Sequence, residues 1–497
     1  MCSVLVAAAT ITQPQLLARD LPIFSVRVTG AVYGENAAQR EAGREVASPL
    51  AGATVACGGA SAVTDASGRY SLSLLRGRDY TCSASAPQYA SMTVSVNPRF
   101  NGSYTLDFGS PLSTSAACAP APSGQRCGAL ALQPGSISGV VLNSATQQPV
   151  NSATIICWDN SLAARSSLSD PARYNTVASA TGQYLLNDAP VGSYLCVAAQ
   201  SETPQPVIVR PGAITTLDFS VCPSHCRGVS YHGGDVMHTF TGYVIFWTPP
   251  GARLDPNGSD ARFRSLVAQY LKDVGGTPFY GLMSQYWDTT GPVRDIARLG
   301  GTYVDTRPYP HAGTVSDPLD NSDVYNEIER VSASQRWPVA PGVGFALITA
   351  YGIQTCATYE GHRSCSFPLS NDSGFCAYHS STSYSNPDST ASYLPYMLIA
   401  DVPGCDYLPT FDLAPAPYGA PLADAVINSL SHEQFEMVTD PAGDGWYDDS
   451  DYSEIGDKCE SSFGYPASDG STVQLANGHG YALQREWSAA AGACSYG

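Results

Sequence analysis

Short runs of alternating apolar and polar residues fill the first half of the chain and recur in two similar segments. Each segment ends with the same spacing from a turn glycine to a cysteine, Gly68 to Cys82 in the first and Gly182 to Cys196 in the second. Alternation with a period of two, interrupted by turn residues, is typical of antiparallel strands. Each segment is therefore expected to form a small β-sandwich.

From residue 228 onward the pattern changes to strand-like runs separated by runs with helical spacing. The continuous apolar runs 243–247, 343–349 and 396–400 predict buried strands. Helical spacing predicts one helix after a cap at Asp260, and a second after a cap at Ser322 or Asp323. A third predicted helix covers residues 422–438 and is stopped by Pro441. This half is expected to be one mixed α/β domain.

These patterns, with a length of 497 residues, predict a multidomain chain. The expected order is an N-terminal segment (1–22), a first all-β sandwich (23–112), a linker rich in Pro, Ser and Ala (113–132), a second sandwich (133–222) and the C-terminal domain (223–497).

The third predicted helix carries the sequence His432-Glu433-Gln434-Phe435-Glu436. Residues four apart share one face of a helix, so His432 and Glu436 point the same way with Glu433 beside them. Zinc peptidases use an H-E-x-x-H helix for two ligands and a general base, and Glu436 here replaces the second histidine by another possible ligand. By chance alone H-E-x-x-E is common, and the alternative is an ordinary polar face of a surface helix.

Carboxylates downstream of this helix supply candidates for a third ligand. Glu454 is the first choice, and Asp457 is either its substitute or a residue that orients His432. Asp440 is a weaker candidate because it sits at the end of the helix. Glu433 would take a proton from water, and four residues are candidates to stabilise an oxyanion: His479, Tyr481, His379 and Tyr447.

The expected cation is Zn²⁺, although two carboxylates and one imidazole would also suit a harder ion such as Mn²⁺ or Ca²⁺. The acidic residues that follow the helix are a separate candidate for structural Ca²⁺, or they form a solvated loop. They are Asp440, Asp444, Asp448, Asp449, Asp451, Glu454 and Asp457.

Charge and cysteine content narrow the environment. A net charge of -18 argues against nucleic acid as a partner. Fifteen cysteines without a C-x-x-C pattern predict disulfides and an oxidising compartment. No segment is apolar enough to predict a transmembrane helix, and residues 1–18 make a poor signal peptide. Asn101, Asn257 and Asn371 begin glycosylation triplets.

Seven disulfides are predicted, with Cys2 left over, and the two that the repeat supports best are Cys57–Cys82 and Cys157–Cys196. The others are Cys118–Cys127, Cys222–Cys226, Cys356–Cys365, Cys376–Cys405 and Cys459–Cys494.

Both halves of the chain resemble known families. The run from Gly52 to Val55, the turn 67–70 and the last strand ending near Cys82 resemble carboxypeptidase regulatory-like (transthyretin-like) modules. The segments 231–236, 375–380, 430–433, 439–441, 446–448, 454–459 and 483–488 resemble, in that order, the phosphate-induced protein 1 (EXORDIUM-like) family and a microbial branch with H-E-x-x-E. This resemblance covers about residues 228–497 and favours a metal site. With the helix motif it implies a zincin-like α+β domain. Plant members are secreted, wall-associated growth proteins that typically lack the His-Glu pair.

Two functions follow as hypotheses. The first is a secreted zinc-metallopeptidase-like hydrolase that acts on peptides, with His432, Glu436, Glu454 and Asp457 as metal ligands and Glu433, His479 and Tyr481 as catalytic groups. The second is a non-catalytic extracellular protein of a matrix or cell wall, structural or adhesive, in which a metal stabilises the fold. Both place the protein outside the cell, at a cell surface or in a matrix.

Overall fold

A computed structural model describes residues 25–41, 47–98, 103–109, 130–161, 164, 171–198, 203–221, 228–359, 362–366, 374–384 and 391–497. The predicted N-terminal segment, almost all of the linker, Cys2 and the pairs Cys118–Cys127 and Cys222–Cys226 lie outside these residues. The five other predicted disulfides are present: Cys57–Cys82, Cys157–Cys196, Cys356–Cys365, Cys376–Cys405 and Cys459–Cys494. A β-rich, disulfide-bonded chain is thereby confirmed.

The first sandwich has two main sheets. One joins β6 (Arg69–Leu75), β1 (Ser25–Ala31) and β9 (Ser103–Thr105). The other joins β5 (Ala60–Val63), β4 (Thr54–Cys57), β7 (Tyr80–Ser85) and β8 (Met92–Val96). A short pair, β2 (Tyr33–Glu35) and β3 (Ala47–Pro49), and the helix α1 (Ala37–Glu41) complete it. The inward residues of the alternating strands form one core that includes Val28, Val55 and Leu72, and Cys57 faces Cys82 across β4 and β7.

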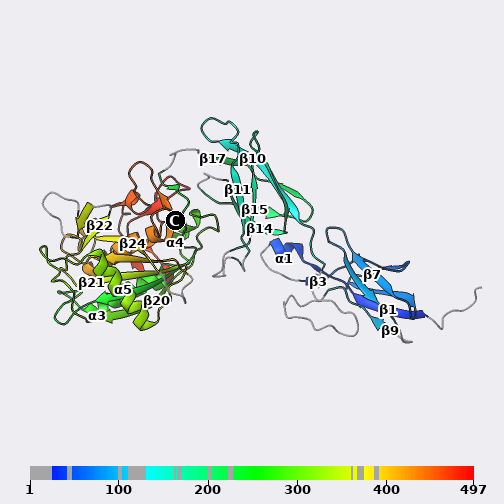
Figure 1. The fold of residues 1–497 in the computed structure, drawn as a ribbon, viewed down its shortest axis with the longest axis horizontal. Helices are drawn as coiled ribbons and strands as arrows, with labels where there is room; N and C mark the ends of the chain where they lie inside the picture. The colour runs from blue at the N-terminus through cyan, green and yellow to red at the C-terminus, as the bar shows by residue number, and fades with distance from the viewer. Residues whose placement is uncertain are drawn as a thin grey trace, which may run out of the picture. The chain divides into compact units, whose positions relative to one another are not determined.

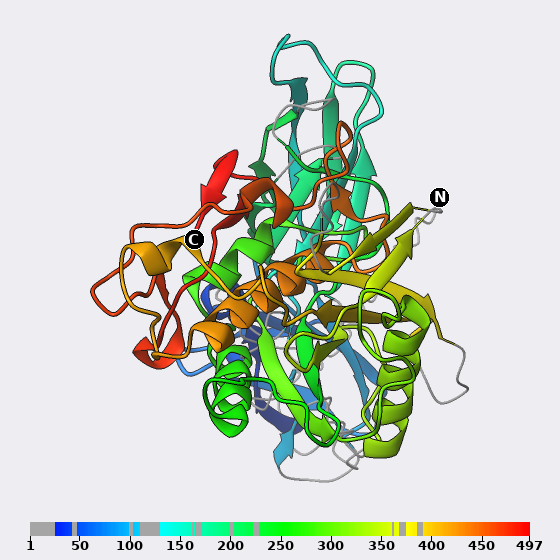
Figure 2. The ribbon, with the colours of Figure 1, turned by 90° about the vertical axis from the view of Figure 1, so that its left-hand side faces the viewer.

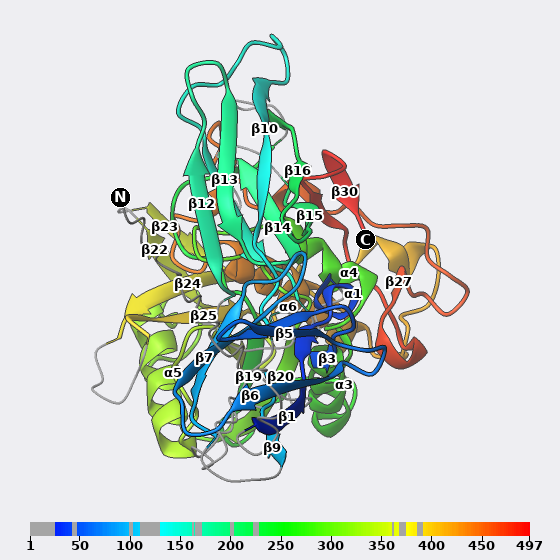
Figure 3. The same cartoon turned by 90° about the vertical axis from the view of Figure 1, so that its right-hand side faces the viewer.

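The second sandwich repeats this plan (Figure 3). In one sheet β10 (Gly135–Asn143) pairs with β13 (Gln183–Ala189), β16 (Ile214–Thr216) and β17 (Phe219–Val221). The other sheet runs β12 (Arg173–Val177), β11 (Thr154–Asp159), β14 (Gly192–Ala198), β15 (Gln205–Val209). Cys157 of β11 lies opposite Cys196 of β14 and is bonded to it, as the repeat predicted.

The C-terminal domain is built on a five-stranded sheet (Figure 1). Its order is β20 (Ala297–Asp305), β19 (Phe240–Trp247), β21 (Val343–Thr349), β25 (Tyr393–Ile399), β24 (Ala377–Ser383). The first four strands are parallel, and β24 is the antiparallel edge strand. The three strands predicted from apolar runs are β19, β21 and β25. Smaller strand pairs decorate the sheet: β18 (Ser230–Tyr231) with β26 (Trp446–Tyr447), β22 (Cys356–Tyr359) with β23 (His362–Cys365), β27 (Val473–Gln474) with β28 (Gly480–Tyr481), and β29 (Glu486–Ser488) with β30 (Ala493–Ser495).

Helices cover both faces of this sheet because its central strands are apolar on both sides. On one face α3 (Asp260–Asp273) and α6 (Pro421–Thr439) share a core with Val244 and Ile348. On the other face α5 (Asn321–Gln335) packs Val324 and Ile328 against Ile245. The short helices are α4 (Pro278–Gly281), η2 (Leu282–Gln285), η3 (Pro409–Asp412), η4 (Asp457–Cys459) and η5 (Ala476–Gly478).

Two predicted helix caps are corrected. Ser259, not Asp260, caps α3 by accepting from the backbone N–H of Arg262, and Asp260 lies in the first turn. Asp320, not Ser322 or Asp323, caps α5, and Asp323 completes a capping box with it. In both cases the helix begins about where the pattern predicted.

The described residues form two compact units. One comprises the residues up to Ser136 together with the segments Asn187–Gly192 and Ile208–Ile214. The other comprises the remaining residues up to Gly497. Most of the second sandwich therefore belongs to the same unit as the C-terminal domain. In the described ranges, no helix combines the length and the apolar character needed to cross a bilayer.

Candidate metal centre

Helix α6 is buried nearly all round, in contrast to the surface helix that was the alternative to a site. It packs on α3 and on the strands β24 and β25 (Figure 2). His432 and Glu436 lie one turn apart as predicted, and His432 Nε2 is 3.2 Å from Glu436 Oε1. Glu433 and Glu436 are only 4% and 3% exposed, so their carboxylates are held away from bulk water.

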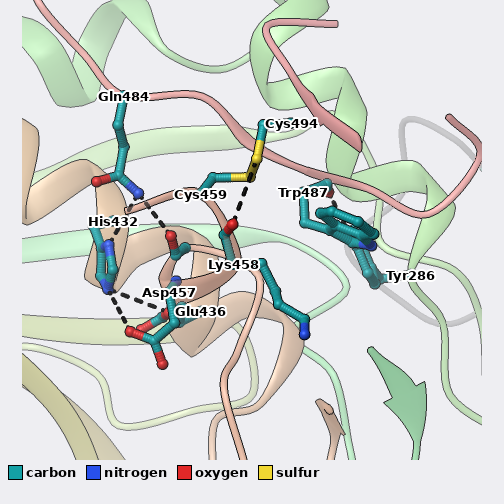
Figure 4. The surroundings of a disulfide bond; sticks show 10 residues. Tyr286, His432, Glu436, Asp457, Lys458, Cys459, Gln484, Trp487 and Cys494 are labelled. Atoms are coloured by element: carbon teal, nitrogen blue, oxygen red, sulfur yellow. Dashed lines mark hydrogen bonds and ion pairs between the residues drawn. A yellow bond between two sulfur atoms is a disulfide. The ribbon is translucent and has the colours of Figure 1, made fainter. Parts of the chain in front are cut away.

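Asp457 joins His432 and Glu436 in a first group of potential ligands. Its Oδ1 is 3.5 Å from His432 Nε2, and its backbone N–H donates to Glu436 Oε1 at 2.9 Å. Figure 4 shows these three side chains pointing toward one another beside the disulfide Cys459–Cys494, which fixes the chain two residues after Asp457. Asp457 is the half-exposed member of the group and forms its solvent side.

Gly456 and Gln484 fix the far side of the His432 ring. A Cβ atom at Gly456 would lie 2.9 Å from His432 Nδ1 and from Glu436 Oε1, so only glycine fits there without a shift. Gln484 Nε2 lies 3.1 Å from His432 Nδ1 and donates to the Gly456 carbonyl at 2.9 Å (Figure 4). For His432 Nε2 to bind a cation, His432 Nδ1 must carry the ring proton. As placed, the Gln484 amide donates to the Gly456 carbonyl and therefore presents an N–H group, not an acceptor, to His432 Nδ1.

His379 of β24 organises a second group around the other oxygen of Glu436. Its Nδ1 lies 3.6 Å from Glu436 Oε2 and 3.3 Å from Glu433 Oε2. Its Nε2 lies 3.5 Å from Glu454 Oε2 and 3.1 Å from the carbonyl of Asp440. His379, Glu436 and Glu454 therefore form one possible ligand set, and His432, Glu436 and Asp457 form another.

Charges within the cluster shift every buried group. Burial alone would lower the pKa of His432 and of His379, but the surrounding carboxylates raise both well above the usual value. Burial would raise the pKa of Glu436, but the two imidazoles outweigh it and hold that pKa low. Burial raises the pKa of Glu433 and, together with Glu436 and Asp440, that of Glu454. Without a cation, protons on the imidazoles balance the carboxylates.

The donor set fits a divalent cation. It consists of two imidazoles and the carboxylates of Glu433, Glu436, Glu454 and Asp457, and among the described residues only histidines form ion pairs with these carboxylates. Two ligand atoms that are each about 2.0–2.2 Å from a tetrahedral cation lie roughly 3.3–3.6 Å apart. The two separations from His432 Nε2, to Glu436 Oε1 and Asp457 Oδ1, are 3.2 and 3.5 Å and share one nitrogen. The two separations from His379, 3.6 Å to Glu436 and 3.5 Å to Glu454, belong to different nitrogens of its ring.

One carboxyl is buried behind the cluster. Glu486 of β29 is fully buried, and neither of its oxygens has a hydrogen-bond partner among the described residues. Burial, more than the opposing attraction of His432, raises the pKa of Glu486 well above its usual range. Burial thus favours the protonated form of this side chain.

The structure does not bring His479 and Tyr481 into this cluster. Both are held at Asp273, the last residue of α3: His479 Nδ1 lies 2.6 Å from Asp273 Oδ2, and the Tyr481 hydroxyl donates to the same oxygen at 2.8 Å. Tyr447 stacks on His232, with ring centroids 3.5 Å apart. Of the four candidates for an oxyanion donor, only His379 lies among the predicted ligands.

The acidic loop after α6 uses its carboxylates internally. Asp440 accepts from the backbone N–H groups of Gly443 and Gly445, Asp448 pairs with Lys458, and Asp451 accepts from Ser453. Asp448, Asp451 and Asp440 thus close turns of the loop, as Asx-type residues commonly do. These contacts occupy the three carboxylates within the loop, and Asp440 and Asp448 are buried, so the loop is not simply solvated.

Sequence reasoning missed the central place of His379. It appeared only as one of four oxyanion candidates, although it lies in a segment, 375–380, that carried the family resemblance. Gln484 was missed in the same way, inside the segment 483–488. Both residues could have been found from the resemblance, because their segments belong to the same ordered set of motifs as the helix with His432.

Fold and site together define a class: a β-rich, disulfide-bonded chain whose C-terminal α/β domain contains a buried cluster of histidines and carboxylates. No family model matches the sequence, and no curated protein matches it. The resemblance to the EXORDIUM-like family therefore stays a prediction.

Partial similarity to solved structures was found. The Bacillus anthracis TIE protein is 10% identical, with 46% of this chain and 37% of that chain covered and a TM-score of 0.21. A streptococcal ancillary pilin is 10% identical, with 41% and 64% covered and a TM-score of 0.18. GBS52, a minor pilin of Streptococcus agalactiae, is 10% identical, with 40% and 97% covered and a TM-score of 0.17. The chain thus spans well under two thirds of the TIE protein. Similarities this slight bear on neither fold nor function.

Proposed function

We propose that the C-terminal domain is a secreted metal-dependent hydrolase that acts on peptide bonds, with a zincin-like site on α6. The supporting observation is the convergence of His432, Glu436 and Asp457, from two separate segments, to ligand-like spacing in a buried site. Asp457 takes the place of third ligand here, and Glu454, the first choice from sequence, pairs with His379. The resident cation is Zn²⁺ or Mn²⁺. When bound it polarises the substrate carbonyl and stabilises negative charge that develops there.

Glu433 is the proposed general base. Its buried carboxylate lies next to the ligands. Burial raises its pKa, which makes the carboxylate a stronger base toward the attacking water. His379 Nδ1, 3.3 Å from Glu433 Oε2, fixes the orientation of that carboxylate.

The Glu433→Gln variant tests this proposal. Purified protein loaded with Zn²⁺ should cleave a fluorogenic peptide mixture, lose that activity with a chelator and regain it with Zn²⁺. Glu433→Gln should lower the rate by roughly 10²–10⁴, the usual contribution of a general base, while the bound metal stays unchanged. Glu329→Gln, at an exposed position of α5, is the matched control and should keep full activity. Cleavage by Glu433→Gln at the wild-type rate would reject the assignment.

An extracellular structural or adhesive protein, bound to a matrix or cell-wall component, is the second candidate. It is favoured by the two sandwiches, each of which has an internal disulfide, Cys57–Cys82 or Cys157–Cys196, and no group of metal ligands among the described residues. In that case a bound cation only stabilises the C-terminal domain. Chelation would then lower the melting temperature, and no peptide cleavage would be restored by added Zn²⁺.

A further inference from the structure

We propose that the centre binds two divalent cations that share the carboxylate of Glu436. This inference rests on the proposed cation site and adds a second ion to it. The first ion is the one held by His432, Glu436 and Asp457. The second is held by His379, Glu436 and Glu454.

The two oxygens of Glu436 face different imidazoles. Oε1 lies 3.2 Å from His432 Nε2, and Oε2 lies 3.6 Å from His379 Nδ1. In a site with a single ion, His379 would instead donate a hydrogen bond to the outer oxygen of Glu436, and the metal content of the His379 variant distinguishes the two cases. A carboxylate between two histidines has the arrangement of a bridging ligand, and two-metal sites hold their ions only about 3.5–4 Å apart.

Each imidazole also has a second carboxylate near it. At His432 this carboxylate lies on the same nitrogen as Glu436, with Asp457 Oδ1 3.5 Å from Nε2. At His379 it lies on the other nitrogen: Glu454 Oε2 is 3.5 Å from Nε2, whereas Glu436 Oε2 faces Nδ1, so the second set is the looser one, with its ligand atoms within 4.8 Å of one another. The two groups come from different places in the fold, since His379 is on the edge strand β24 and His432 is on α6. The result is two sets, one on each side of Glu436, and each set has one histidine and one carboxylate that the other set does not use.

The charge of the cluster can accommodate two divalent ions. Glu433, Glu436, Glu454 and Asp457 bring four acidic groups together, and their only ion-pair partners among the described residues are His379 and His432. The nearby lysine, Lys458, is paired with Asp448 instead. Imidazoles must be neutral to bind metal, so with all four carboxylates ionised one divalent ion leaves two negative charges in a mostly buried site. A second divalent ion compensates them, as would protons on Glu433 and Glu454, whose pKa values burial raises.

Metal content of the intact chain tests the proposal without an activity assay. After saturation with Zn²⁺ and removal of free metal, elemental analysis should find two ions per wild-type chain. His379→Gln and Glu454→Gln should each retain one ion, Asp457→Asn should also retain one, and Glu436→Gln should lose both or bind both weakly. His311→Gln is the matched control, because His311 also lies between two carboxylates but in an exposed loop, and it should retain two.

Mn²⁺ gives a second readout that reports proximity. Two Mn²⁺ ions bridged by one carboxylate should give a spin-coupled electron paramagnetic resonance spectrum, and Glu454→Gln, which keeps the shape of the side chain, should convert it to that of an isolated ion. A wild-type chain that binds a single ion, lost in His432→Gln but kept in His379→Gln, would overturn the shared site and leave the proposed hydrolase standing. A chain that binds no ion would overturn both.

Discussion

At the scale of single residues, the C-terminal domain places ionisable side chains in its interior for two different purposes. Around Glu436 the buried carboxylates face imidazoles and can exchange protons for a cation. Asp401 is also buried, but it forms no ion pair with a described residue. It lies just after β25, it is 1% exposed, and its Oδ2 has no hydrogen-bond partner among the described residues. Such a group reduces stability whenever it is charged.

Asp401 should therefore make the protein less stable as pH rises. Burial, and then the like charges of Asp406, Asp255 and Asp260, raise the pKa of Asp401 to about 8. Because the folded-state pKa of Asp401 is raised, its full contribution to the free energy of unfolding is present below the unfolded-state pKa of about 3.9. This contribution is lost as pH rises toward the folded-state pKa of about 8. Asp401→Asn cannot ionise, so its stability relative to wild type should grow from pH 4 to 8, by on the order of a few kcal/mol. Urea unfolding of both proteins at pH 5 and pH 8 measures this.

Asp469→Asn provides the control for that experiment. Hydrogen bonds from the hydroxyl and the backbone N–H of Ser471 lower the pKa of Asp469, an exposed residue. Its carboxylate is therefore ionised in both the folded and the unfolded chain between pH 5 and pH 8. The difference between Asp469→Asn and wild type should be constant over this range. A constant difference for Asp401→Asn as well would show that Asp401 is not protonated in the folded state.

At the scale of elements, the edge hairpin β24–β25 decides whether the centre is complete. Only β24 supplies a ligand candidate from outside α6 and the loops after it, and His379 pairs in register with Met397 of β25. The disulfide Cys376–Cys405 closes the end of this hairpin at which Ala377 pairs with Ile399. The bond is three residues from His379, so it restricts the motion of the strand that positions the imidazole.

Loss of this disulfide should affect both stability and cation binding. The bond closes a loop of 29 residues, and removal of such a cross-link costs about 3–4 kcal/mol in the chain-entropy description. The double variant Cys376→Ser/Cys405→Ser should show that loss in urea unfolding and should bind the ion at His379 more weakly. Cys356→Ser/Cys365→Ser, which opens the separate pair β22–β23, should lower stability less because its loop is shorter, and should leave metal content unchanged. Equal metal content in both double variants would contradict this role.

The elements also show what sequence can and cannot reveal. The strands β19 and β21 were predicted because each contains a continuous apolar run, and the helix α6 because its apolar residues recur at helical spacing. The strand β24 was not predicted, because it is mostly Ser, Thr and Tyr and is half-buried except at its exposed last residue. His379 therefore had no assigned position, and its approach to Glu433, 54 residues away, depends on the fold. Likewise, nothing near His479 in sequence indicates Asp273, which is 206 residues away.

At the scale of the whole molecule, the second sandwich shares a core with the C-terminal domain inside one compact unit. The sequence predicts a separate sandwich and C-terminal domain. Trp158 and Trp287 are far apart in sequence, and nothing in the sequence indicates that these two apolar residues are in contact. In the structure their ring centroids lie 5.9 Å apart, and the Trp287 ring also packs against Tyr231 and Trp446. Arg173 adds a hydrogen bond from its guanidinium to the carbonyl of Thr289 at 2.6 Å.

Trp158→Ala should uncouple the second sandwich from the C-terminal domain. Trp158 is fully buried in the shared core, and replacement of such a side chain by alanine typically costs about 3–5 kcal/mol. Wild-type chain should show one calorimetric transition for this unit, and Trp158→Ala should show an earlier transition for the sandwich and a later one for the domain. Trp158→Phe keeps an aromatic ring against Trp287 and should have an intermediate effect. Metal content should stay at the wild-type value, because Trp158 contacts none of the ligands. A single transition at the wild-type temperature in Trp158→Ala would mean that the shared core does not couple the two parts.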